Sequence, residues 1–128
     1  MKSNISKLPA PIVGEEMVIK KDNLLTTLPS IDKEYKITFD MFITKHIVDN
    51  FRTVVHFTVG GNNDKYGDRT PGVWTFKKRL SVASAVSGNR NKVFMYPKIL
   101  EEGKWTNVEI SQSLVDDKAN RAFIFLRI

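Results

Sequence analysis

The clearest pattern in the chain is an alternation of apolar and polar residues in the segment 34–44, EYKITFDMFIT. A period of two residues is typical of a β-strand that is buried on one face and exposed on the other. The apolar positions are Tyr35, Ile37, Phe39, Met41 and Ile43. Only Phe42 interrupts the polar face, which indicates that this face is partly covered as well.

Further segments have the β-branched and aromatic composition of strands and are separated by residues that favour turns. They cover residues 52–59, 72–76, 80–86, 92–96, 105–113 and 121–128. Within them we expect Val55, Phe57 and Val59 to share one face, and Val108 and Ile110 to point inward. About seven short strands at this spacing predict an all-β fold, an antiparallel sandwich or barrel.

The loop 60–74, GGNNDKYGDRTPGVW, concentrates glycines, amides, carboxylates and aromatic residues. Amide and carboxylate groups beside an aromatic ring are suited to holding a sugar, and oxygen ligands are those that calcium prefers. The structural alternative is a long hairpin loop held by Asx turns and an Asp68–Arg69 network, with Trp74 in the core. The candidate ligand contacts are Asn62, Asn63, Asp64, Tyr66, Asp68 and Arg69.

Composition narrows the class of protein. The chain has 128 residues, 41% hydrophobic and 27% charged, which fits one soluble globular domain. The absence of cysteine excludes a disulfide scaffold, thiolate metal sites and a cysteine nucleophile. No apolar run approaches the roughly 18 residues of a membrane span, and the first residues lack the apolar core of a signal peptide.

The net charge of +6 is unevenly distributed. Residues 1–70 have 10 Lys and Arg against 9 Asp and Glu, whereas residues 71–128 have 10 against 5. Such a surplus favours either anionic partners or simply a solvated basic surface. A nucleic-acid interface is not favoured, because no RNP-like or zinc-finger pattern accompanies the basic residues Lys77, Lys78, Arg79, Arg90 and Lys92.

Catalysis has little support in the sequence. The two histidines, His46 and His56, do not show zinc-ligand spacing, and no nucleophile elbow or phosphate-binding loop is present. Glycosidases need two carboxylates that converge on the glycosidic bond to be cleaved. The adjacent acidic pairs of this chain are typical of turns and do not provide such an arrangement. We therefore predict that the chain is not an enzyme and has no catalytic residue, and that calcium is the one cofactor worth testing.

Five segments occur in an order that resembles the concanavalin A-like (laminin-G-like) jelly-roll superfamily. They are a "y.i.fd" strand at 35–40, "h.t.GG" at 56–61, "GdRtP.vw" at 67–74, "nGn" near 88–89 and "W..ieisq" at 105–112. The resemblance covers about residues 20–128. It implies two stacked antiparallel sheets in a jelly roll, an N-terminal extension at 1–19, and an extracellular module that binds ligands at its loops or on its concave sheet.

The resemblance also implies that such modules continue beyond a strand like 121–128. We therefore expect an incomplete jelly roll that lacks its final strands, with an open sheet edge filled by a partner chain or a second copy. The predicted function is non-catalytic recognition of carbohydrate or a glycosylated surface through the 60–74 loop. The alternative is a structural or assembly module that makes protein–protein contacts through open sheet edges, without a small ligand.

Overall fold

The computed structural model describes residues 11–20, 23–30, 34–47, 49–61, 67–86, 89–116 and 121–127. The chain divides into two compact units, residues 1–30 and 31–128. Within the first unit, residues 11–20 and 23–30 form neither helix nor strand, and all of them are exposed. The domain boundary after residue 19 stays a prediction.

The second unit contains seven strands, and the described part of the chain has no helix. The strands are β1 Tyr35–Phe42, β2 Arg52–His56, β3 Gly72–Phe76, β4 Arg79–Val86, β5 Asn89–Met95, β6 Trp105–Asp116 and β7 Arg121–Arg127. The prediction of an all-β fold is confirmed, because each of the seven segments with strand-like patterning forms one strand.

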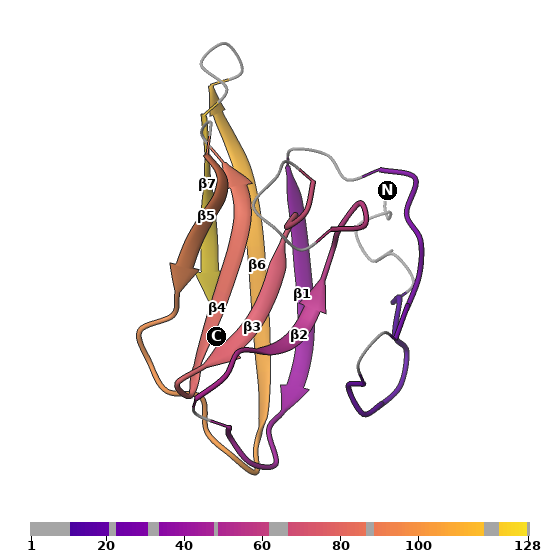
Figure 1. Ribbon diagram of the computed structural model, residues 1–128, viewed down its shortest axis with the longest axis vertical. Helices are drawn as coiled ribbons and strands as arrows, with labels where there is room; N and C mark the ends of the chain where they lie inside the picture. Colours follow the sequence, from indigo (N-terminus) through magenta and orange to yellow (C-terminus); the bar gives the residue numbers. More distant parts are fainter. Residues whose placement is uncertain are drawn as a thin grey trace, which may run out of the picture. The chain divides into compact units, whose positions relative to one another are not determined.

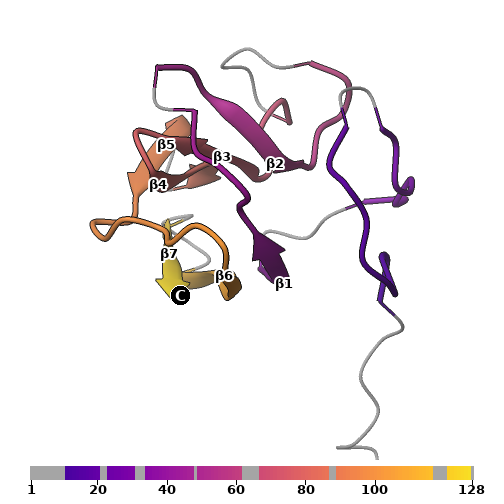
Figure 2. The same cartoon turned by 90° about the horizontal axis from the view of Figure 1, so that it is seen from below.

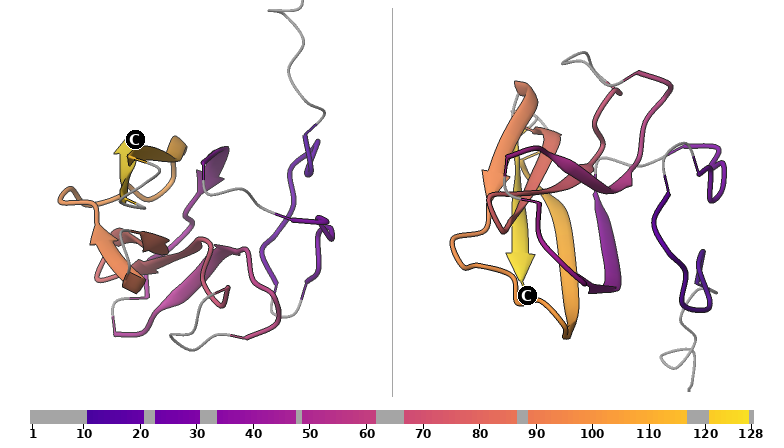
Figure 3. Two further views of the ribbon diagram at one scale, coloured as in Figure 1. Left: turned by 90° about the horizontal axis from the view of Figure 1, so that it is seen from above. Right: turned by 60° about the horizontal axis from the view of Figure 1, so that its bottom comes forward.

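The strands form two antiparallel sheets that lie in separate layers (Figures 1 and 2). One sheet has the order β1-β6-β7, and the other has the order β2-β3-β4-β5. The chain leaves the first layer after β1, builds the second layer as a meander, and returns after β5 (Figure 3). The architecture is that of a β-sandwich, and the jelly-roll topology is not confirmed.

Apolar residues from both sheets form one core. Met41, Val108 and Ile110 come from the three-stranded sheet, and Val73, Leu80 and Val82 come from the four-stranded sheet. The alternation predicted for β1 is confirmed, since its odd-numbered residues are buried or half-buried and its even-numbered residues are exposed. The period of two in β1 and β6 therefore places one face of each strand against the opposite sheet.

The second strand departs from the predicted pattern. It ends at His56 and not at Val59, which is exposed. A register shift between Thr53 and Val55 makes Val54 an extra residue of the strand. Because such a bulge interrupts the alternation, both Val54 and Val55 pack against the core. The expected shared face of Val55, Phe57 and Val59 is therefore wrong beyond Val55.

A polar cluster of three side chains connects the two sheets at one end of the core. Gln112 Oε1 accepts hydrogen bonds from the Ser84 hydroxyl at 2.8 Å and from the Tyr35 hydroxyl at 3.2 Å. The two hydroxyl oxygens lie 2.8 Å apart. Ser84 is on β4, whereas Tyr35 and Gln112 are opposite each other on β1 and β6. Burial raises the pKa of the Tyr35 phenol, and the hydrogen bond with Ser84 partly opposes this increase.

This raised pKa predicts a loss of stability at alkaline pH. The unfolded chain ionises Tyr35 near its ordinary pKa of 10.0, whereas the folded chain keeps the phenol neutral to higher pH. The free energy of unfolding should therefore be unaffected by this group below about pH 10 and should fall as the pH rises beyond it. Urea denaturation between pH 8.5 and 11 would test this, with Tyr35→Phe as the comparison. Equal pH dependence in the two proteins would contradict the prediction.

Candidate functional site

A groove follows β4 on the outer face of the four-stranded sheet. Since Leu80 and Val82 point into the core, the alternate residues Ser81 and Ala83 point outward. Their small side chains form the floor of the groove, and taller side chains stand on both sides of it. We call this cavity of about 280 Å³ the β4 groove; it is lined by Phe51, Arg69, Trp74, Ser81, Ala83 and Val93.

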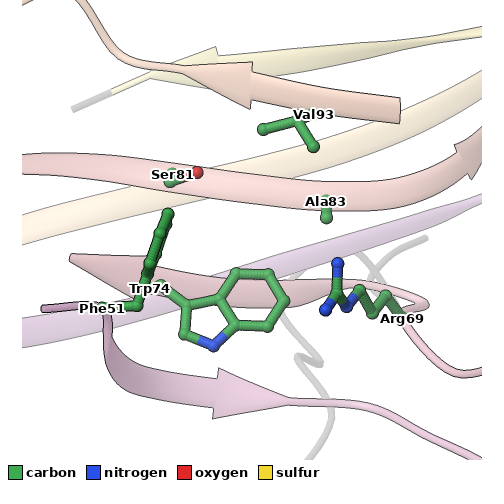
Figure 4. A pocket seen from close by; sticks show the side chains of 6 residues that line it. All are labelled: Phe51, Arg69, Trp74, Ser81, Ala83 and Val93. Carbon is green, nitrogen blue, oxygen red and sulfur yellow. The ribbon is translucent and has the colours of Figure 1, made fainter. Parts of the chain in front are cut away.

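The walls of the β4 groove come from neighbouring strands. Trp74 is directly opposite Ser81 on β3, Val93 is opposite Ala83 on β5, and Phe51 directly precedes β2. Figure 4 shows the Trp74 indole face-on, with the Arg69 guanidinium beside it and the Phe51 ring edge-on. Because these residues come from consecutive strands and the loops next to them, the meander order β2-β3-β4-β5 brings them together.

Arg69 is the charged group of the groove, and two contacts hold its position. Its guanidinium carbon lies 5.2 Å from the centre of the Trp74 ring, within the range of a cation–π interaction. Its Nη1 donates a hydrogen bond to Asn91 Oδ1 on β5 at 3.1 Å. A planar guanidinium presents its N–H donors in fixed directions, so these two contacts fix the plane in which the Arg69 donors lie at the groove.

Phe51 is the most exposed aromatic ring of the groove. It stacks on Phe76 with a centroid distance of 4.1 Å and an interplanar angle of 7°. Phe51 is nevertheless 57% exposed, whereas Trp74 is only 8% exposed. Since one face of Phe51 covers Phe76, its opposite face is left as an apolar surface. Trp74 therefore forms part of the wall of the groove but offers a ligand little free ring surface.

The loop that contains Arg69 is anchored at its base by backbone hydrogen bonds. Phe57 N donates to Pro71 O at 2.9 Å, and Thr70 N donates to Phe57 O at 3.0 Å. Further out, Val59 N donates to Gly67 O at 2.9 Å, where Gly67 has a φ of 89°. These bonds place Arg69 directly beside β2 and β3, and so at the end of the groove.

Asp68 lies inside the loop and not on its surface. The residue is 6% exposed, and its carboxylate occupies the space where a side chain at position 61 would be, which glycine leaves open. The Asp68 carbonyl oxygen is hydrogen-bonded to His56 Nε2 at 2.6 Å, and the His56 ring packs near Trp74. His56 and Asp68 therefore pack beside Trp74 and the base of the loop. The structural interpretation of the loop placed Trp74 in the core; the residue is buried, but it lines the groove on the outer face and does not belong to the core cluster between the sheets.

Of the predicted ligand contacts, the structure places Arg69 on the groove, whereas Asp68 is buried inside the loop and does not line the groove. Asn62, Asn63, Asp64 and Tyr66 lie outside the described residues. Sequence reasoning missed Phe51 and Val93, because nothing in the local pattern shows which strands become neighbours. One sequence pattern does indicate the floor of the groove. Small residues, Ser81, Ala83 and Ala85, alternate along a strand whose other face is mainly apolar.

The described residues contain no group of three or more His, Cys, Asp or Glu side chains that could hold a metal ion. Calcium stays a candidate only for the undescribed part of the 60–74 loop. Over those same described ranges, no helix is long and apolar enough to cross a membrane.

Comparisons with known proteins find no matching family model, no matching curated protein and no matching solved structure. The resemblance to the concanavalin A-like superfamily therefore stays a prediction.

Proposed function

We propose that this chain is a non-catalytic, extracellular recognition module that binds carbohydrate in the β4 groove. The observation that carries the proposal is the position of Arg69, which reaches the groove from the 60–74 loop, is held against the Trp74 ring and lines the same cavity as the exposed ring of Phe51. The ligand contacts predicted at Asn62, Asn63, Asp64 and Tyr66 stay part of this proposal, although they lie outside the described residues.

The lining of the groove suits one sugar unit better than a large apolar ligand. Ligand pockets usually combine apolar walls with a few placed polar groups, over about 300–1,000 Å³. A cavity of about 280 Å³ is slightly smaller than the lower limit of that range. The apolar face of a sugar ring can lie against Phe51, while its hydroxyls accept hydrogen bonds from the Arg69 guanidinium. Ser81 adds a hydroxyl at the floor.

A glycan array probed with and without calcium tests this function. We expect binding to at least one class of glycan, and we expect Arg69→Ala to weaken it by tenfold or more, because the main polar contact is lost. Lys45→Ala is the matched control, since it removes one positive charge from an exposed turn outside the groove. Equal binding by Arg69→Ala and the wild type would contradict the proposed site.

The alternative function, assembly through open sheet edges, has one observation in its favour. Val93 and Met95 are about half exposed on β5, which is an edge strand of its sheet. Exposed apolar side chains on an edge strand are suited to pairing with another chain. Light scattering would detect self-association; a dimer that Met95→Lys dissociates, together with an array that shows no glycan binding, would favour assembly.

A further inference from the structure

A second aromatic surface lies on the outer face of the three-stranded sheet. Phe42, the last residue of β1, is directly opposite Trp105, the first residue of β6. Their ring centroids are 5.4 Å apart and the rings are tilted by 57°. Phe42 is 45% exposed and Trp105 is 53% exposed. We propose that these rings, together with Asp40 and Asn107, form a binding site for a neutral sugar ring that is separate from the β4 groove.

The polar half of this site is the neighbouring cross-strand pair. Asp40 is opposite Asn107, and each lies two positions along its strand from an aromatic residue, so all four side chains share one face. Asn107 Nδ2 donates a hydrogen bond to Asp40 Oδ1 at 2.8 Å. Asn107 Nδ2 also donates to Phe39 O at 3.5 Å, so both of its protons have partners within the protein. The pair therefore presents acceptor oxygens, Asn107 Oδ1 and the Asp40 carboxylate, which match the O–H donors of two adjacent hydroxyls on a sugar. The arrangement therefore combines a stacking surface with hydrogen-bonding groups at its border.

Hydrogen bonds between two loops hold the aromatic pair in place. Phe42 leads into one loop and Trp105 follows the other. Gly103 N donates to Ile43 O at 2.8 Å, His46 N donates to Glu102 Oε2 at 2.6 Å, and His46 Nε2 is hydrogen-bonded to Leu100 O at 2.8 Å. Because these bonds tie the loops together, the two rings need little ordering when a ligand binds.

The size of the aromatic surface favours a sugar over a protein partner. About half of each ring is exposed, which amounts to roughly 200 Å² for two aromatic side chains of 150–250 Å² each. A stable protein interface needs about 800 Å² on each partner. One sugar ring, in contrast, needs only a surface of the size that Phe42 and Trp105 provide.

The charges around the site favour a neutral sugar over an acidic one. Lys36 forms a salt bridge with Glu109 at 3.3 Å, and Lys104 pairs with Glu101 at 2.5 Å. Both lysines are therefore already compensated, and Asp40 adds a negative charge next to the rings. An anionic ligand would therefore meet the Asp40 carboxylate at the rings, while Lys36 and Lys104 are each already paired with a glutamate.

The test is an NMR titration of the indole N–H signals with four neutral oligosaccharides: cellohexaose, laminarihexaose, mannohexaose and maltohexaose. The chain has two tryptophans, so the spectrum of Trp105→Phe assigns both signals. We expect at least one oligosaccharide to shift the Trp105 signal. Trp105→Ala should weaken that binding by tenfold or more, and Asp40→Asn should weaken it severalfold. Lys92→Ala, which removes an exposed charge from β5 of the other sheet, should leave it unchanged.

Unfolding midpoints in urea would show whether each variant is folded, and Trp105→Phe, which keeps an aromatic ring, should retain part of the affinity. The proposal is wrong if none of the four oligosaccharides shifts the Trp105 signal, or if Trp105→Ala binds as tightly as the wild type. A shift of the Trp74 signal alone would also overturn it, while supporting the β4 groove.

Discussion

Gly72→Ala is expected to destabilise the protein by about 3 kcal/mol, the upper end of the cost of overpacking. Gly72 is buried at the start of β3, and a Cβ at this position would overlap the six-membered ring of Trp74. The indole cannot move inward, because Gly72 lies directly beneath it. It must therefore leave its position against Arg69 and His56.

Urea denaturation followed by tryptophan fluorescence would measure this effect. In a Trp105→Phe background only Trp74 emits, and its emission should shift to longer wavelength as the indole becomes exposed. Gly14→Ala is a matched control, since a Cβ there would make only ordinary contact with Pro11 Cγ at 3.9 Å. A Gly72→Ala protein with wild-type stability and unchanged Trp74 emission would show that this packing is wrong.

Gln112→Met is expected to cost about 2–3 kcal/mol, although the two side chains have similar size. Gln112 Oε1 accepts hydrogen bonds from both Ser84 and Tyr35. Without it, the two hydroxyls can still bond to each other, but one O–H then has no acceptor in a buried position. A buried donor left without a partner costs about 1–3 kcal/mol.

A mutant cycle would measure how much of the destabilisation by Gln112→Met depends on the hydroxyls of Ser84 and Tyr35. Adding Ser84→Ala to Gln112→Met should recover little stability, because the Tyr35 hydroxyl then loses Ser84 as its acceptor and one O–H is still left without a partner. Adding Tyr35→Phe to that double variant removes the last donor of the cluster and should recover most of the loss. Strictly additive losses across the three positions would mean that the cluster does not act as a unit.

The strands could be predicted from the sequence because each depends on a local pattern. The period of two in 35–42 and the inward positions of Val108 and Ile110 follow from the burial of one face. The bulge at Val54 could not be predicted, since it depends on how β2 pairs with β3. Sheet order also depends on contacts between distant segments, such as β1 with β6.

The candidate site was predictable only in part, for the same reason. The 60–74 loop is recognisable from its composition, and Arg69 does reach the groove. The structure adds Phe51 and Val93, which become neighbours of Arg69 only when β2, β3, β4 and β5 lie side by side. On the other sheet, Phe42 interrupts the polar face of β1, and its contact with Trp105 on β6 accounts for that interruption.

The most direct test of the β4 groove as a carbohydrate site is an NMR titration with the glycan that binds most strongly on the array. If the glycan binds in the β4 groove, the signals of the Trp74 indole N–H and of the backbone amides of Ala83 and Val93 should shift. All three shifts should disappear in Arg69→Ala. If no glycan binds with or without calcium, or if a bound glycan leaves these three signals unchanged, the β4 groove is not the recognition site.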